Sequence, residues 1–106
     1  MIIVTTETVP GCRVREVHGP CYGAVVRSRG AVSNLTAGLR TLMGGEITEY
    51  SQLIEQAREQ AIDRMAQHAA QLGANAVLMM RFDTADTDQT MMGVVAYGTT
   101  AVVEPL

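Results

Sequence analysis

The 106-residue chain contains no tryptophan and a single phenylalanine, and aromatic residues make up only 4% of it. Proteins that bind single-stranded nucleic acid stack bases on aromatic side chains, so this chain offers few such platforms. The Gly-x-Ser-x-Gly, P-loop and dinucleotide-binding motifs are absent as well. We therefore expect no nucleic-acid partner, and the sequence assigns no catalytic residue.

Long apolar runs and cysteines are equally scarce. No run approaches the roughly 20 residues that span a bilayer, so we expect no membrane partner. The N-terminal Met-Ile-Ile-Val-Thr-Thr-Glu lacks the basic start of a signal peptide, which predicts a cytoplasmic protein. In that compartment the two cysteines, Cys12 and Cys21, are expected to be free thiols.

The chain does have the composition of one globular domain covering residues 1–106, with 47% hydrophobic and 18% charged residues. Every basic residue is an arginine, and most of them precede residue 46, where only Glu7 and Glu16 oppose them. Guanidinium groups pair well with phosphate and carboxylate, so a symmetric assembly could gather them into an anion-attracting ring. A solvated strand face is the simpler interpretation and is favoured. These arginines are Arg13, Arg15, Arg27, Arg29 and Arg40.

The C-terminal part of the chain predicts two strands that are apolar on both faces. Side chains alternate across a strand, yet Ala76–Phe82 and Met91–Val103 place apolar residues on either side. An antiparallel sheet in a monomer normally has one polar face, and the one long helix of this chain can cover only one face. The simplest cover for the second face is another copy of the chain, so the pattern predicts a homo-oligomer.

The N-terminal part predicts two further strands. Met1–Thr6 is a short extended segment, and the turn sequence Val9-Pro10-Gly11 ends it. Arg13–Val26 is a longer extended segment, in which Gly19-Pro20 and Gly23 are expected to bend or bulge the backbone.

Two helices lie between these pairs of strands. Ser33 caps a short helix that Gly44-Gly45 stops, and Thr48 caps a long helix whose apolar stripe continues to Gly73. The sequence therefore predicts an α+β domain, in which an antiparallel sheet packs on one long helix plus a short helix. The predicted order of elements is β-β-α-α-β-β.

His68 lies near the middle of the apolar stripe of the long helix, about one turn from Met65 and Leu72. No Cys, Asp or Glu shares this central strip of the helix, so a metal-ligand role has little support. We expect a buried neutral histidine that hydrogen-bonds to the backbone.

Cys12, His18 and Cys21 are the candidate ligands for a metal, because thiolate and imidazole groups suit zinc and soft transition metals. The set supplies three ligands where a structural zinc site needs four. His18 and Cys21 also fall on opposite faces of a regular strand unless Gly19-Pro20 bends it. The spacing is therefore weak evidence, and the cofactor stays open, with a transition metal as the candidate.

Motifs spread over most of the chain match the pattern of a known family. They are Ala37-Gly38, Arg40, Gly44-Gly45, Tyr50, Ala57-Arg58, Gly73-Ala74-Asn75-Ala76-Val77 and Gly98-Thr99. In this ordered set the chain resembles the YbjQ-like family, small bacterial proteins that carry a heavy-metal-binding label. The resemblance implies a subunit similar to those of dodecins, assembled into a pentameric ring. The chain departs from the family pattern at Met79-Met80, where many relatives are expected to place glycine.

The resemblance singles out four residues as ligand-binding or interface residues. Tyr50 and Arg58 combine an apolar body with a polar tip, and Glu55 is placed to orient Arg58. For both residues an interface role is favoured over ligand binding. The other two are Arg40 and Asn75, and Asn75 is expected to hydrogen-bond within the turn after the long helix.

These features favour a non-enzymatic homo-oligomeric ring that binds an anion, a small molecule or a metal in a central or intersubunit cavity. One alternative is a small thiol- or metal-dependent enzyme with a site between subunits, in which Cys21 and His18 or His68 act as nucleophile and base. Another alternative is a structural module that presents its ring to a partner protein.

Overall fold

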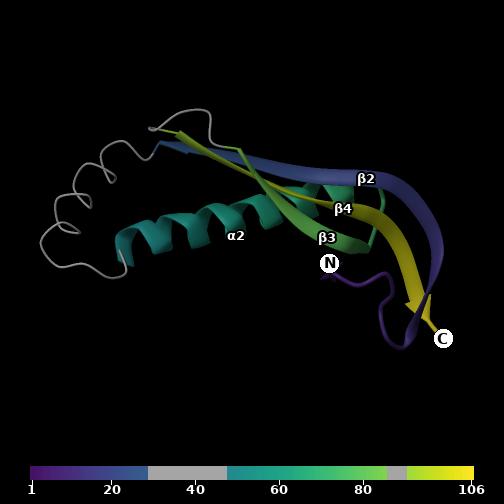
Figure 1. The fold of residues 1–106 in the computed structure, drawn as a ribbon. Helices are drawn as coiled ribbons and strands as arrows, with labels where there is room; N and C mark the ends of the chain where they lie inside the picture. Colours follow the sequence, from purple (N-terminus) through teal and green to yellow (C-terminus); the bar gives the residue numbers. More distant parts are fainter. Residues whose placement is uncertain (29–47, 86–90) are drawn as a thin grey trace, which may run out of the picture.

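The computed structural model describes residues 1–28, 48–85 and 91–106, which form four strands and one long helix (Figure 1). The short helix expected after Ser33 lies outside the described residues. The four predicted strands and the long helix are all present, so the α+β class is confirmed. In chain order the elements are β1 (Ile2–Ile3), β2 (Cys12–Ser28), α2 (Thr48–Gln71), β3 (Ala76–Ala85) and β4 (Met91–Pro105).

The strands form one sheet in the order β1-β3-β4-β2. Strand β4 is antiparallel to both β2 and β3, but β1 is parallel to β3. The sheet is therefore mixed, and the prediction of a purely antiparallel sheet is wrong. The reason is that the N-terminal segment runs alongside β3 in the same direction, with Ile2 N–H donating to Asn75 O and Val4 N–H to Val77 O.

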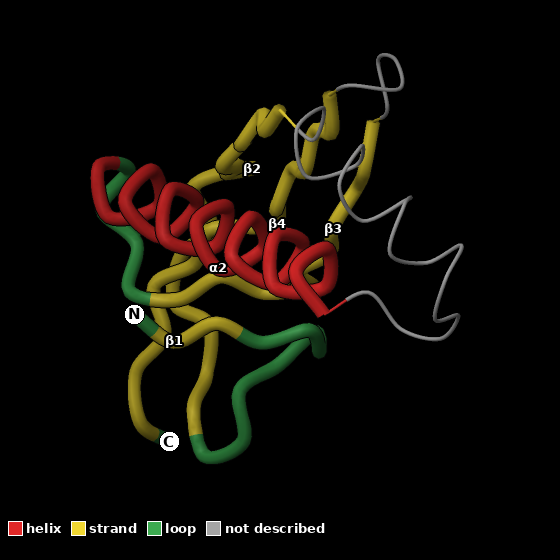
Figure 2. The backbone as a smooth tube through the Cα atoms, turned by 90° about the vertical axis from the view of Figure 1, so that its left-hand side faces the viewer, coloured by secondary structure: helices red, strands yellow, loops and turns green. Residues whose placement is uncertain are grey.

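Helix α2 lies across one face of the sheet (Figure 2) and ends where the sequence predicts. Gly73 has a φ of +83°, the left-handed conformation that glycine adopts at low cost. Ala74 N–H donates to Ala69 O and Gly73 N–H donates to Ala70 O, which is the hydrogen-bond pattern of a Schellman motif. Within the described residues, no helix is long and apolar enough to cross a membrane.

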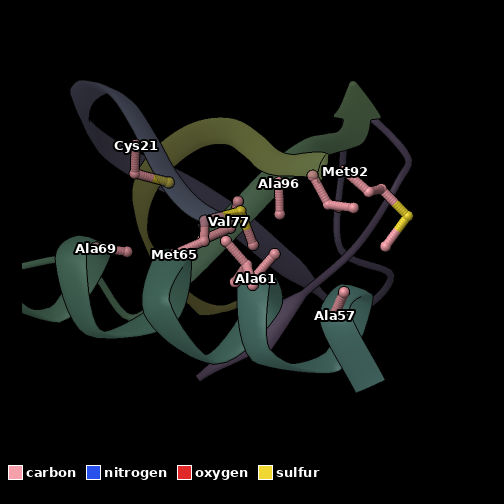
Figure 3. Packing of buried hydrophobic residues seen from close by; sticks show 10 residues of the cluster. Cys21, Ala57, Ala61, Met65, Ala69, Val77, Met92 and Ala96 are labelled. Carbon is pink, nitrogen blue, oxygen red and sulfur yellow. The ribbon is translucent and has the colours of Figure 1, made fainter. Parts of the chain in front are cut away.

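Small side chains bring α2 very close to the sheet (Figure 3). Ala57, Ala61 and Ala69 are fully buried around Met65. A Cβ atom at Gly23 would lie 2.3 Å from both Ala61 O and Met65 N, so no larger residue fits there without moving the helix. The pairing of β2 with β4 continues without a register shift through Gly23, so the prediction of a bulge at this residue is wrong. The role of Gly23 is to let α2 approach the sheet closely.

The bends of the sheet occur at three register shifts. Two are in β2, between Val14 and Glu16 and between Val17 and Gly19, and the expected bend at Gly19 is confirmed by its φ of +89°. Here β2 and β4 curl around together towards the C-terminus (Figure 1). The third shift lies in β3 between Leu78 and Arg81, and it places Met79 at a φ of +57°. Extra residues of this kind bend a strand and increase its twist.

Candidate functional site

The face of the sheet that points away from α2 is the candidate site, and we call it the outer face. Along β4, Val94 and Ala96 pack towards the helix, so the alternation of side chains directs Val95 and Tyr97 to the outer face. Strand β2 follows the same rule, since Cys21 and Val25 belong to the helix-side core. Tyr22 therefore belongs to the outer face, directly opposite Tyr97 in the antiparallel register. Because β2 is an edge strand, the Tyr22 ring also reaches the His68 ring of α2 around that edge, at a centroid distance of 4.9 Å.

One end of the outer face is covered by the N-terminal segment. We call this the covered end, and it is the buried cluster of Ala76, Leu78, Ala101 and Val103. Val4, Val9 and Cys12 pack against this cluster. Arg81 Nη1 donates to Thr5 O at 2.9 Å, which holds the N-terminal segment in place.

The other end of the outer face has no such cover. Tyr22, Val26 and Tyr97 keep 60%, 62% and 44% of their surface exposed, although large apolar side chains are usually buried. Arg81 and Asp83 pair with Tyr97 and Val95 in the register and border this surface on β3. We call it the bare end, and it comprises Tyr22, Ala24, Val26, Val95 and Tyr97.

Asn75 joins the strands next to the covered end. Its Nδ2 donates to Val103 O at 2.9 Å, and its Oδ1 accepts from Val103 N–H at 2.8 Å. The backbone of the same residue accepts from Ile2 N–H and donates to Ala101 O. The Asn75 side chain therefore holds β4, and the expected side-chain hydrogen bond within the turn is wrong, because both of its polar atoms bond to Val103.

Arg58 lies on α2 with its guanidinium carbon 5.2 Å from the centre of the Phe82 ring. This distance is typical of a cation–π contact. Its neighbour is thus Phe82 rather than Glu55, and Arg58 makes no ion pair with any described residue. Tyr50 lies in the first turn of α2, but its side chain falls outside the described part, as does all of Arg40.

The three candidate metal ligands are separated by the fold. Cys21 is in the helix-side core, whereas Cys12 packs at the covered end, about 30 Å away along β2 at the usual rise of a strand. His18 points elsewhere, with its Nε2 3.0 Å from Glu16 Oε2. No group of three or more His, Cys, Asp or Glu side chains that could hold a metal occurs among the described residues.

The nucleophile and base of the enzyme alternative are also placed unfavourably. Burial raises the pKa of the Cys21 thiol, and a backbone hydrogen bond at Gly98 offsets only part of that effect. A thiol with a raised pKa is a poor nucleophile at neutral pH. His68 already accepts a hydrogen bond at Nδ1 from the Tyr22 N–H, at 3.1 Å. This confirms the expected backbone partner of His68, which is half-buried rather than fully buried.

The sequence did not single out Tyr22, Val26 or Tyr97 as site residues. A signal for them was present, because the doubly apolar pattern of the last strand includes Tyr97. What the sequence lacked was the register that brings Tyr22 and Val26 beside it. The exposed outer face is formed by this pairing of β2 with β4.

Comparison with known proteins places the chain among uncharacterised relatives. It matches the family profile YbjQ_1, described as "Putative heavy-metal-binding", over residues 1–104. It is 55% identical to a UPF0145 protein of Bradyrhizobium sp. (strain ORS 278), across 99% of this chain and 95% of the relative. A UPF0145 protein of Picrophilus torridus is 51% identical, across 100% of this chain and 90% of the relative. Relatives thus occur in archaea as well as in bacteria, so the family is wider than the small bacterial proteins of the resemblance.

A solved structure supports the fold. The chain is similar to the crystal structure of a protein of unknown function from Pediococcus pentosaceus, assigned to the DUF74 family, with a TM-score of 0.53 and coverage of 98% of both chains. At 14% identity this likeness speaks for the fold alone. The match over residues 1–104 and the identities above 50% show the family directly, and the chain belongs to the YbjQ family of UPF0145 proteins.

Proposed function

We propose that this protein is a non-enzymatic homo-oligomeric ring whose subunits meet through the bare end of the outer face. The bare end is the observation that carries this proposal. Its tyrosine and valine side chains form one continuous apolar strip across β2 and β4. A strip of this kind on a soluble subunit is an aggregation hazard unless a partner removes it from water.

The proportions of the chain support the same proposal. Its radius of gyration is 17.3 Å, whereas a compact chain of this length has about 13 Å. Strands of 17 and 15 residues, β2 and β4, are about three times the usual length. An extended ribbon buries less of its own surface than a compact domain does, so it gains more from a neighbouring copy.

The number of subunits and the ligand belong to the same proposal. The family resemblance implies five subunits and a dodecin-like arrangement, and we adopt a pentamer as the working hypothesis. A ring requires two different surfaces of the subunit to meet, because head-to-tail contacts are what close into a cycle. The bare end would then face a different part of the neighbouring copy.

For the ligand of the ring, we favour an anion or an anionic small molecule between subunits. Arg13 and Arg15 both approach Glu104, so their charge is partly compensated within the subunit. Arg58 is exposed and rests on Phe82 with no ion pair among the described residues, which leaves its charge available to a ligand or to a neighbouring copy. Tyr50, Arg40 and Asn75 remain proposed ligand-binding or interface residues on the strength of the resemblance.

A metal fits the described residues poorly. The family description names heavy metals, but the thiols of one subunit lie in separate clusters, and the described residues bring no three metal-binding side chains together. Within the described part, one subunit therefore does not supply a metal centre. We assign no function to a metal here.

Native mass spectrometry with elemental analysis of the purified protein tests the proposal in one preparation. We expect a single oligomer and no stoichiometric metal. A Val26→Lys variant should shift the protein to monomer, because it places a charge in the bare end. Leu106→Lys is the matched control, since Leu106 is 88% exposed at the end of the chain and its variant should assemble as the wild type does. A wild-type protein that is monomeric at micromolar concentration would overturn the proposal.

A further inference from the structure

A row of side chains on α2 reaches over the free edge of strand β2. Gln60, Arg64 and His68 are spaced by four residues, which places them along one face of the helix. The strand order makes β2 an edge strand of the sheet. A long open edge presents unpaired N–H and C=O groups and is a ready template for pairing with a strand of another molecule.

Two members of the row bond to backbone groups of this edge. Tyr22 N–H donates to His68 Nδ1 at 3.1 Å, and Arg64 Nη1 donates to Ala24 O at 2.6 Å. Backbone groups of residues two apart point to the same side of a strand, so both groups belong to the side facing away from β4. Pro20 occupies the preceding position on that side and has no N–H to offer. Three of the groups that an incoming strand would use are therefore occupied or missing.

Further contacts hold the row in position. Gln60 Oε1 accepts a hydrogen bond from Arg27 Nη2 at 2.6 Å, which ties the first member of the row to β2. The Tyr22 ring meets the His68 imidazole edge to face, with centroids 4.9 Å apart. The row therefore makes a contact with β2 at each of its three positions, rather than extending freely into solvent.

We propose that Gln60, Arg64 and His68 form an edge guard that closes residues 20–24 of β2 to strand addition by a second copy of the chain. The guard does not depend on the ring, because an open β2 edge would be a hazard for a monomer and for an oligomer alike. Its effect is on specificity, because it prevents copies from pairing edge to edge at residues 20–24 of β2. Natural sheets protect their edges by related means, including proline, charged side chains and a covering helix.

The test is a double variant, Arg64→Met/His68→Ala, which removes both bonds to the edge and keeps an apolar stem at residue 64. We expect hydrogen exchange at the Tyr22 amide to become about tenfold faster, the factor that corresponds to the loss of one ordinary hydrogen bond. Sedimentation velocity should show a new species, larger than the wild-type one, whose share rises with concentration. Restoring a donor with Arg64→Lys/His68→Ala should reduce the share of that species. If the double variant does not fold, His68→Ala alone, which removes the bond to the Tyr22 N–H, is measured in the same way.

The matched control is Asp63→Asn/Gln67→Ala, which alters two residues of the same helix, one position before Arg64 and one before His68. This control should behave as the wild type in both measurements. Unchanged exchange and unchanged sedimentation in the double variant would overturn the proposal. Faster exchange without a new species would also overturn it, because the bonds would then serve only to pack the helix on the sheet. A monomeric wild type would count against the ring but not against the guard.

Discussion

The two ends of the outer face have similar amino-acid character but opposite environments. At the covered end, Leu78 and Val103 are each only 6% exposed, because the N-terminal segment crosses over them. At the bare end, Val26 is 62% exposed on the same face of the same sheet. Apolar side chains occur at both ends, and the N-terminal segment covers those of β3 and β4 at one end only. On β2 this cover is incomplete, since Val17, opposite Ala101, keeps 59% of its surface exposed.

This comparison shows how the chain divides the work of covering its sheet. Helix α2 covers one face, and the short N-terminal segment covers one end of the other face. The remaining apolar strip is what we propose a second copy covers. The ends can therefore be separated experimentally, since a change at the covered end should reduce folding stability and a change at the bare end should reduce association.

The largest expected effect is a charge buried at the covered end. Leu78→Asp should lower the free energy of unfolding by about 4 kcal/mol or more, because an unpaired carboxylate would replace a buried side chain. Val26→Asp, its counterpart at the bare end, should change the stability of the subunit by no more than about 0.5 kcal/mol while preventing assembly. Urea denaturation at low protein concentration, with light scattering for assembly, gives both quantities. Equal loss of stability in the two variants would remove the distinction between the ends.

Next in size is the loss of the amide that fastens β4 beside the covered end. Asn75→Ala removes two hydrogen bonds to the Val103 backbone and should cost about 2 kcal/mol in urea denaturation. Asn75→Asp keeps an acceptor for the Val103 N–H but not the donor, so its loss should be intermediate. If assembly were lost at full subunit stability, Asn75 would belong to the interface instead.

The bulge between the two ends offers a smaller change of opposite sign. Met79 has a φ of +57°, a conformation that costs an L-residue more than it costs glycine. Met79→Gly should therefore raise the free energy of unfolding by about 0.5–1 kcal/mol, after the greater flexibility of glycine in the unfolded chain is subtracted. Met80→Gly is the control, because Met80 is not left-handed and packs on the helix-side core, and it should be destabilising. A Met79→Gly variant less stable than the wild type would show that the side chain outweighs the strain.

The smallest expected effect concerns the two thiols, which report on the two faces of the sheet. Burial raises the pKa of Cys21 above its ordinary value of 9.0, so iodoacetamide at pH 8 should modify the half-buried Cys12 first. Because the pKa of the Cys21 thiol is higher in the folded state, its titration stabilises the folded protein. This contribution to the free energy of unfolding is complete below pH 9.0 and is lost as the pH rises through the pKa of the folded state. Cys21→Ala should remove that alkaline loss. Mass spectrometry of the modified protein checks the order, and faster reaction at Cys21 would contradict the burial argument.

Local patterns in the sequence were enough to predict most of the elements. The helix stop at Gly73, the bend at Gly19 and the apolar last strand each depend on the conformational freedom of a few neighbouring residues. The parallel pairing of β1 with β3 was not predictable in this way, because residues 2–3 and 76–77 are far apart in sequence. The residues of two short strands do not by themselves determine whether the strands pair in parallel or antiparallel. The role of Gly23 was not predicted for a similar reason, because it depends on backbone atoms of Ala61 and Met65 in α2 that pack against it.

The candidate site, too, was predictable only in part from the sequence. By itself, the sequence determined that the last strand is apolar on both faces, because side-chain alternation is a local property of any strand. The same prediction for β3 is wrong beyond Leu78, because the bulge turns Met80 and Phe82 to the helix side and leaves Arg81 and Asp83 opposite the outer-face residues of β4. Only the tertiary structure decided which part of that surface stays exposed. The N-terminal segment reaches Leu78 and Val103 but not Tyr97, and the register of β2 adds Tyr22 and Val26 to the uncovered strip. Burial of an apolar side chain depends on neighbours brought from distant parts of the chain, and no local pattern specifies those neighbours.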